Sequence, residues 1–169
     1  MQRTISAMVG KGSVNHNSRK FRAENVDGTR THLNIDYCNE NIKTVYHELF
    51  DEALERYNAK QIRSDRKIKD YYEKIRSSKQ EKPFHEIILQ VGGKGNMNAD
   101  TENGELAKQI LDEYYQGFQE RNPQLRVFSA HLHMDEATPH LHIDFVPFTT
   151  GSKRCLLYTS PSPRDKRQS

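Results

Sequence analysis

The 169-residue chain has no long apolar run, so a membrane-spanning helix is not expected. No stretch approaches the ~20 consecutive apolar residues that such a helix needs. The first twelve residues, MQRTISAMVGKG, also lack the apolar segment of a secretory signal peptide. We therefore expect a protein of the cytoplasm.

Cysteine is scarce, with only Cys38 and Cys155, and the second begins an unusual C-terminal segment. Residues 155–169 show no hydrophobic periodicity of either kind. The run CLLYTSPSPRD resembles the translation of a sequencing-library adapter, so we expect a non-native read-through at the end of a truncated reading frame. The alternative is a disordered Ser/Pro-rich tail. Either way, residues 1–154 are expected to form one domain, in which Cys38 has no partner for an internal disulfide.

A strong net charge is also missing, which limits what overall charge can say about partners. The formal charge is +3 for the whole chain and falls to +1 without residues 155–169, which hold Arg164, Lys166 and Arg167 against Asp165. The distribution is more informative. Residues 60–79 contain eight basic and three acidic side chains, a pattern typical of a surface that contacts DNA phosphates. A solvated helix with internal ion pairs is the alternative.

The hydrophobic share of 34% indicates a thin core, with one sheet covered by helices. Alternation predicts strands over residues 2–9, 32–37, 83–93, 126–133 and 140–147. Helical periodicity predicts one long helix or two consecutive ones over 41–78, and another over 101–122 capped by Thr101. The predicted fold class is α+β, with a mainly antiparallel five-stranded sheet, helices packed on one face and the active site on the other.

The last two strands form a predicted hairpin whose faces differ in chemistry. A six-residue turn, MDEATP, separates them. The apolar face is expected to carry Phe128, Ala130, Leu132, Leu141, Ile143 and Phe145. The polar face is expected to carry Ser129, His131, His133, His140, His142 and Asp144.

Three of these histidines are expected to form a metal site. His140 and His142 project from one face of a strand, and His133 lies across the hairpin, where cross-strand Cβ atoms are ~4.5–5.5 Å apart. Three imidazoles leave coordination positions open, as in a catalytic site, whereas structural zinc needs a fourth protein ligand. Exposed polar residues on a solvated sheet face are the simpler alternative. Imidazole favours Mn²⁺, Zn²⁺, Co²⁺ and Ni²⁺ over Mg²⁺.

The neighbouring polar residues have less definite roles. Glu136 in the turn could complete the metal shell, orient a ligand histidine or position a proton. Asp135 and Asp144 are candidates to accept hydrogen bonds from the ligand histidines. His131 lies one step further along and is expected at the periphery or in contact with DNA.

The string HMDEATPHLH at residues 133–142 resembles the HxDExTPHxH signature of the MobV-type Mob/Pre plasmid mobilisation relaxases, within the HUH endonuclease superfamily. Residues 15–19, NHNSR, resemble the HNxR motif of that family, and residues 32–34, HLN, resemble another of its segments. The motifs together span residues 15–148.

This resemblance implies a metal-dependent enzyme that nicks and rejoins single-stranded DNA at an origin of transfer through a covalent 5′-phospho-enzyme intermediate. It implies His16 as the nucleophile, with Arg19 and Glu136 as further catalytic residues. Tyr37, Tyr71 and Tyr72 remain alternative nucleophiles. The implied metal is Mn²⁺ in the first place, with Mg²⁺ or Zn²⁺ as alternatives.

Single-stranded or supercoiled plasmid DNA is the implied partner. The residues expected to contact it are Lys20, Arg22, His32, Asn34, Arg63, Arg66, Lys67, Lys69 and His131. The family also implies contacts with the conjugative coupling machinery through a C-terminal region missing here, and a homodimer. Two alternative functions remain: an HUH rolling-circle replication initiator, whose tyrosine should follow the hairpin, and a phosphohydrolase without a covalent intermediate.

Overall fold

The computed structural model describes residues 4–93 and 95–150, so the predicted tail at 155–169 lies outside the described residues. The core of the molecule is a five-stranded sheet with the order β1-β3-β5-β4-β2. Its strands are β1 Ile5–Val9, β2 Ile35–Asn39, β3 His85–Val91, β4 Leu125–His133 and β5 His140–Pro147. All four pairings are antiparallel, which confirms the predicted fold class.

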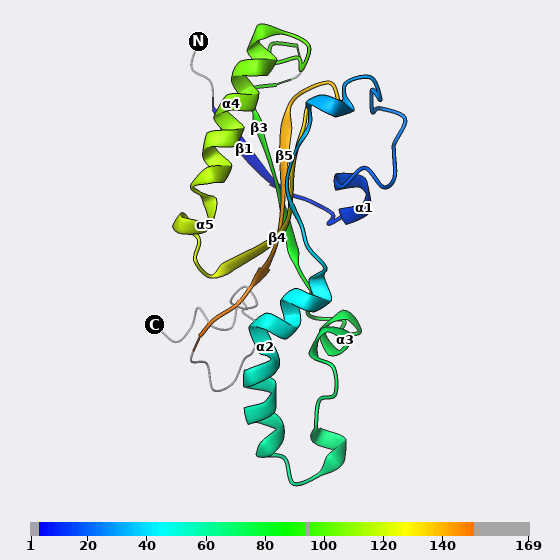
Figure 1. The fold of residues 1–169 in the computed structure, drawn as a ribbon, viewed down its shortest axis with the longest axis vertical. Helices are drawn as coiled ribbons and strands as arrows, with labels where there is room; N and C mark the ends of the chain where they lie inside the picture. The colour runs from blue at the N-terminus through cyan, green and yellow to red at the C-terminus, as the bar shows by residue number, and fades with distance from the viewer. Residues whose placement is uncertain (1–3, 94, 151–169) are drawn as a thin grey trace.

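Helices pack around this sheet (Figure 1). They are α1 Val14–Asn17, α2 Ile42–Ala59, α3 Tyr71–Arg76, α4 Glu102–Gln116 and α5 Phe118–Arg121, with short 3-10 helices η1 Thr31–Leu33 and η2 Ser64–Arg66. Within the described ranges, no helix combines the length and the apolar character that crossing a membrane requires.

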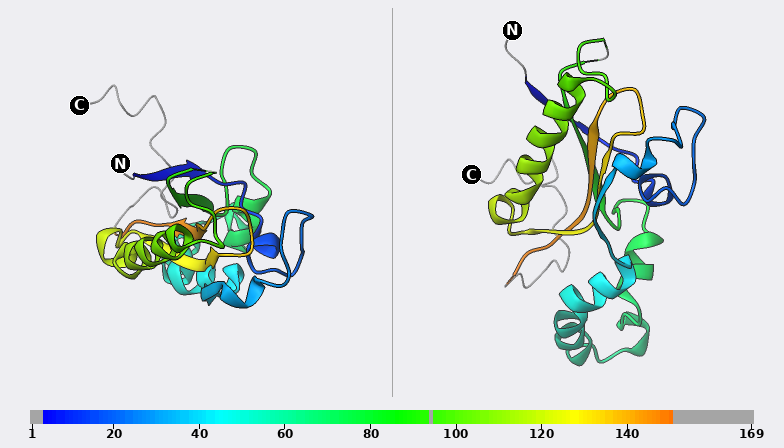
Figure 2. Two further views of the ribbon diagram at one scale, coloured as in Figure 1. Left: turned by 90° about the horizontal axis from the view of Figure 1, so that it is seen from above. Right: turned by 45° about the horizontal axis from the view of Figure 1, so that its top comes forward.

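One face of the sheet is covered by α4 and α5 (Figures 1 and 2). The Thr101 hydroxyl caps α4 by accepting from the Gly104 N–H at 3.2 Å, as the sequence predicted. Ala107 and Leu111 of α4 are fully buried against Leu141 and Ile143 of β5. This apolar layer holds the central strands in place.

We expect Ile143→Ala to lower the free energy of unfolding by about 2–5 kcal/mol, because it deletes a fully buried side chain from this layer. Urea denaturation measures the effect. Ile62→Ala is the control, since Ile62 is completely exposed and should change stability by less than about 0.5 kcal/mol. Equal losses in both variants would contradict this description of the core.

A β-bulge in β4 moves Phe128 to the opposite face from the one predicted. The pairing steps from Val127↔Phe145 to Ser129↔Asp144, so Phe128 is an extra residue on its strand. Phe128 therefore packs with Val146 in a second apolar cluster, apart from Ala130 and Leu132. This cluster also takes in α2 and α3, which lie at one end of the molecule's long axis (Figure 1).

The single helical region predicted over 41–78 is two helices separated by a loop. Asn58 closes that loop, because its side chain donates to the Ile68 carbonyl at 2.8 Å and accepts from the Ile68 N–H at 2.9 Å. Asp70 then caps α3 by accepting from the Glu73 N–H. The predicted basic stripe is therefore not on one helix.

The second predicted strand is displaced along the chain. His32 and Leu33 belong to η1, and β2 begins only at Ile35. The cause is Asn34, whose side chain accepts from the Met134 N–H at 2.7 Å and so ties the start of the strand to the β4–β5 turn.

Candidate metal centre and active site

Three histidine side chains meet where β4 and β5 approach their turn. His133 pairs with His140 across the two strands, and His142 lies two residues further along β5. One nitrogen from each ring lies within 4.8 Å of the others. The cross-strand geometry expected from the sequence therefore brings these three residues together.

Each ring is anchored through one nitrogen and turns the other toward the common point. His133 Nε2 donates to the Asn17 carbonyl at 2.7 Å, and His140 Nδ1 donates to the Thr138 carbonyl at 2.9 Å. His142 Nδ1 donates to Glu86 Oε1 at 2.8 Å. Because the acceptors fix where each proton sits, the second nitrogen of each ring carries a free lone pair.

These lone pairs fit a divalent cation. His133 Nδ1 and His140 Nε2 are 3.4 Å apart. Two nitrogens that each lie ~2.1 Å from one ion should be roughly 3.0–3.4 Å apart. His142 Nε2 is buried and has no hydrogen-bond partner among the described residues, although a buried polar atom normally has one. A metal ion would satisfy it.

The environment of His133 and His140 favours their neutral forms, as metal ligation requires. Burial, together with the nearby His142 and Arg19 side chains, lowers the pKa of His133 to about 2. Burial and the neighbouring His142 also lower the pKa of His140.

Glu136 in the β4–β5 turn faces the same point. Its Oε1 lies 3.6 Å from His140 Nε2 and 4.0 Å from His133 Nδ1. The same oxygen accepts from Arg19 Nη2 at 2.9 Å, and Asn25 donates to Oε2 at 2.8 Å. Glu136 is therefore within reach as a further ligand while its charge is balanced by Arg19.

His16 lies beside the three histidines on the short helix α1. Its ring centroid is 6.3 Å from that of His133 and 6.4 Å from that of His142. Arg19 Nη1 lies 3.3 Å from His16 Nε2, and Glu136 Oε1 lies 3.5 Å from the same nitrogen. A guanidinium can only donate, so the hydrogen bond with Arg19 uses the tautomer of His16 that has its lone pair on Nε2. His16, Glu136, His140 and His142 line one open cleft of about 410 Å³.

Asp135 has a different role from the one predicted. It makes no hydrogen bond to a ligand histidine and instead accepts from Arg19, Thr31 and Asn34. Burial opposes its ionised form, but these hydrogen bonds outweigh burial and lower the pKa of Asp135 to about 2. Asp135 thereby holds Arg19, whose backbone is in the left-handed region with a φ of 57°.

Asp144 is likewise not the carboxylate that orients His142. It accepts from the Asn17 side chain at 3.1 Å, and burial together with nearby Glu86 raises its pKa to about 7. The orienting carboxylate is Glu86 of β3, which the sequence analysis missed. The sequence did contain a hint, because Glu86 is a charged residue within a mostly apolar strand. Glu86 and Ile88 lie on the face of the sheet that carries the ligand histidines.

Comparisons with known proteins agree with these motifs. A family model described as "Plasmid recombination enzyme" (Mob_Pre) matches residues 12–158. The chain belongs to this family. This confirms the resemblance to Mob/Pre proteins noted from the sequence.

Curated relatives include "Plasmid recombination enzyme type 3" from Staphylococcus aureus and from Mammaliicoccus lentus. Each is 29% identical over 144 residues, which cover 83% of this chain and 30% of the relative. The chain therefore spans about 30% of the length of these relatives.

Solved structures share the fold. A MobM relaxase domain (MOBV; Mob_Pre), Mn-bound and in complex with oriT DNA of plasmid pMV158 at pH 5.5, superposes with a TM-score of 0.54 at 21% identity. The match covers 96% of this chain and 79% of that chain. The same domain at pH 4.6 gives a TM-score of 0.51, also at 21% identity, over 91% of this chain and 77% of that chain.

Two of the residues predicted to contact DNA have structural roles in this chain instead. His131 is 1% exposed, with its ring nitrogens bonded to Asp36 at 2.6 Å and Ser129 at 3.1 Å, so its side chain cannot reach DNA in this conformation. Asn34 is occupied by its bonds to Asp135 and Met134. His131 lies within β4 and Asn34 directly before β2, where internal hydrogen bonds use both side chains.

The other predicted DNA contacts fall in two places. Lys20 and Arg22 are exposed just after α1, and His32 is exposed in η1. Arg63, Arg66, Lys67 and Lys69 lie in the loop and η2 between α2 and α3, at one end of the molecule (Figure 1). Arg63 there forms an ion pair with Asp65 at 2.6 Å.

None of the tyrosines named as alternative nucleophiles lines the cleft that holds His16. Tyr37 packs on the α4 face, where its hydroxyl donates to Asp112 at 2.6 Å and its ring stacks on Tyr115. Tyr71 and Tyr72 belong to the cluster around α2 and α3. Their positions argue against a role at the metal centre.

We expect Glu86→Gln to weaken Mn²⁺ binding by about 10- to 100-fold, because the amide cannot hold the His142 ring as the carboxylate does. Titration calorimetry with MnCl₂ measures the affinity. Glu113→Gln, on the exposed side of α4, is the matched control and should bind like the wild type. Unchanged affinity in Glu86→Gln would remove Glu86 from the metal centre.

Proposed function

We propose that this chain is the DNA-nicking and strand-joining part of a plasmid mobilisation relaxase. One observation carries the proposal: His16 lines the same open cleft as His140 and His142, two of the three imidazoles that converge on one point. The family membership and the fold shared with a relaxase domain bound to origin DNA support it.

The proposed reaction is a phosphoryl transfer from oxygen to the nitrogen of His16. The lone pair of His16 Nε2 attacks the scissile phosphodiester, an N–P bond forms, and the bond from phosphorus to the 3′ oxygen breaks. The imidazole loses one proton and the departing 3′ oxygen gains one, so the 5′ phosphate stays on His16 and a 3′-hydroxyl is released. The reverse step rejoins the strand.

Arg19 is proposed to bind the phosphate that reacts. Its guanidinium lies against both His16 and Glu136 and is held from behind by Asp135. A phosphate oxygen entering the cleft would accept from Arg19, which frees the His16 lone pair for attack. Arg19 is then already in position to stabilise the negative charge on the phosphate oxygens.

His133, His140 and His142 would hold a divalent metal ion, with Glu136 beside it. When bound, the ion polarises the scissile phosphate and neutralises its charge. We propose Mn²⁺ first, because imidazole suits it better than Mg²⁺ and the MobM domain was Mn-bound. Mg²⁺ and Zn²⁺ are the alternatives.

Plasmid DNA at an origin of transfer is the proposed partner, which implies a cytoplasmic location. Lys20, Arg22 and His32 are exposed and would contact the strand. The loop that carries Arg63, Arg66, Lys67 and Lys69 would bind DNA further away. Contacts with the coupling machinery, and a homodimer, are proposed to involve sequence that the longer relatives have beyond the aligned residues. We also propose that the nuclease domain is residues 1–154.

Incubation with supercoiled mobilisable plasmids and Mn²⁺ tests this function. A relaxase gives open-circular DNA with protein joined to the 5′ end, and peptide mapping then finds the attached residue. Cleavage without an adduct would identify a phosphohydrolase. An adduct on a tyrosine would favour the chemistry of replication initiators. Intact plasmid at every metal tested would overturn the proposal.

A further inference from the structure

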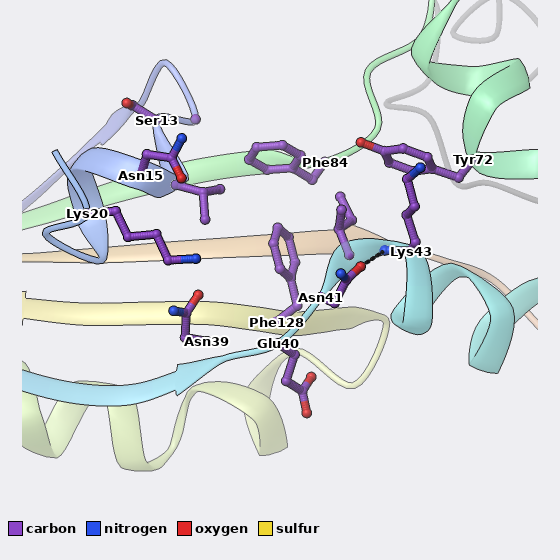
Figure 3. Close-up of a pocket in the computed structure, with 13 residues that line it drawn as sticks. Ser13, Asn15, Lys20, Asn39, Glu40, Asn41, Lys43, Tyr72, Phe84 and Phe128 are labelled. Carbon is purple, nitrogen blue, oxygen red and sulfur yellow. Dashed lines mark hydrogen bonds between the residues drawn. The ribbon is translucent and has the colours of Figure 1, made fainter.

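A second and larger cavity, of about 670 Å³, lies next to the active site (Figure 3). The same elements build both places. On α1, Asn15 lines the cavity, His16 lines the cleft, and the Asn17 carbonyl holds His133. Phe84, directly before β3, lines the cavity, and Glu86 within β3 holds His142. Because these residues are one or two positions apart, the cavity is within a few nucleotides of the scissile phosphate.

Aromatic rings form the middle of the cavity. Phe128 is buried beneath it, and the Phe84 ring meets it edge to face at a centroid distance of 5.2 Å. The Phe84 ring packs directly against the backbone of Gly12. Only glycine suits this position, because a Cβ there would come within 2.9 Å of Phe84 Cε2 and the φ of Gly12 is +74°. Phe84 is only partly buried, so its ring is available to a ligand. Tyr72 stands at one end, with Lys43 Nζ 5.5 Å from its ring centroid.

The polar residues around these rings have unused hydrogen-bonding groups. Asn15 and Asn39 are exposed, and their side-chain amides bond to no described residue. Asn41 uses only its Oδ1, which accepts from the Lys43 N–H at 2.9 Å, so its amide NH₂ group remains available. Figure 3 shows the Asn15, Asn39 and Lys20 side chains gathered at one end of the cavity.

The charge of the cavity favours an anionic ligand. Lys20 makes no ion pair with any residue in the described ranges, and Lys43 contacts Glu73 at 3.4 Å. Glu40 also lines the cavity, but its carboxylate is paired with Arg126 at 2.7 Å. The unpaired cation is therefore Lys20, next to the free amides.

We propose that this cavity binds one unstacked nucleotide of the DNA single strand, on the side of α1 away from the scissile phosphate. The amides of Asn15 and Asn39 bond the edge of the base, Phe84 contacts its π-face, and Lys20 contacts the adjoining phosphate. A purely apolar ligand would leave the amides without partners, and a simple anion would not use the rings. The inference rests on the proposed function, since it assumes a single strand in the neighbouring cleft.

Equilibrium binding of two short fluorescent strands tests the proposal. One is oligodeoxythymidine, and the other is an abasic strand of equal length and charge. We expect the wild type to prefer the strand with bases. Phe84→Ala should weaken binding of the thymidine strand by about 5- to 100-fold and leave the abasic strand unchanged, because stacking acts on bases alone.

Asn39→Ala provides a second test that does not disturb the aromatic cluster. It should lower the preference for the thymidine strand by about fivefold, since it removes hydrogen bonds to the base edge. Gln109→Ala, exposed on α4 on the other side of the sheet, is the control. If both cavity variants bind the two strands like the wild type, or weaken both strands equally, the cavity does not hold a base.

Photocrosslinking locates the base directly. A strand with 5-iododeoxyuridine should crosslink to peptides that contain Phe84 or Tyr72, whereas crosslinks found only elsewhere would overturn the proposal. Plasmid nicking, measured in parallel, separates the two hypotheses. An adduct without base preference counts against the cavity alone, and base preference without an adduct supports the cavity while counting against the nicking function.

Discussion

Replacement of His16 by alanine should abolish the covalent protein–DNA adduct while leaving Mn²⁺ binding intact. The fall should be about 10⁴–10⁶-fold, because loss of a nucleophile removes the covalent pathway altogether. His16 donates no hydrogen bond to a metal-centre histidine, so its removal leaves the anchored rings in place. The adduct is measured on denaturing gels with labelled origin strands, and Mn²⁺ affinity by calorimetry.

Two control variants make this result specific. His47→Ala removes an exposed histidine of α2 that pairs only with Asp51. Tyr37→Phe removes an alternative nucleophile on the α4 face. Both should form the adduct at the wild-type level. Full adduct formation by His16→Ala, or its loss in Tyr37→Phe, would show that the nucleophile lies elsewhere.

Replacement of His140 by alanine should weaken Mn²⁺ binding by more than about 100-fold, which exceeds the usual cost of losing a residue that only orients a ligand. The His140 ring supplies one of three converging nitrogens, and Thr138 already orients it. Strand cleavage should fall with metal occupancy. Electron paramagnetic resonance of free Mn²⁺ measures the affinity.

Thermal unfolding gives an independent readout of the same site. Mn²⁺ at ~100 times its Kd should stabilise the wild type by about 2.7 kcal/mol, and chelation should reverse the effect. The corresponding rise in Tm is about 5–10 °C for a chain of this size. His140→Ala should show a rise of at most about 1–2 °C, because at this Mn²⁺ concentration it is at most about half occupied. His85→Ala is the matched control, since His85 lies on β3 beside Phe145 on the opposite face. A normal Mn²⁺ response in His140→Ala would refute the three-histidine centre.

The fold was largely predictable because alternation and turn chemistry are local properties of a chain. Four of the predicted strands overlap their observed positions closely, and His133 lies across the hairpin from His140 as expected. The bulge at Phe128 was not predictable, because an extra residue in one strand shows only in the pairing with its neighbour. The break between α2 and α3 depends on the bonds between Asn58 and Ile68, which are ten positions apart.

The sequence by itself determined which residues could form the metal centre. His133, His140 and His142 converge because strand periodicity places them on one face and the short turn brings the two strands together. It also identified the family, through the segment around His16 and the acidic turn.

Only the tertiary structure decided how these residues are held. Glu86, which accepts the hydrogen bond from His142, is 56 positions away in the sequence. Asp135 accepts hydrogen bonds from Arg19 and not from the ligand histidines. His131 is buried where β4 pairs with β2, although it is two residues from the ligand His133 on the same strand. The physical reason is that a buried polar group takes whichever partner the packing brings close, and that partner is set by distance in space rather than along the chain.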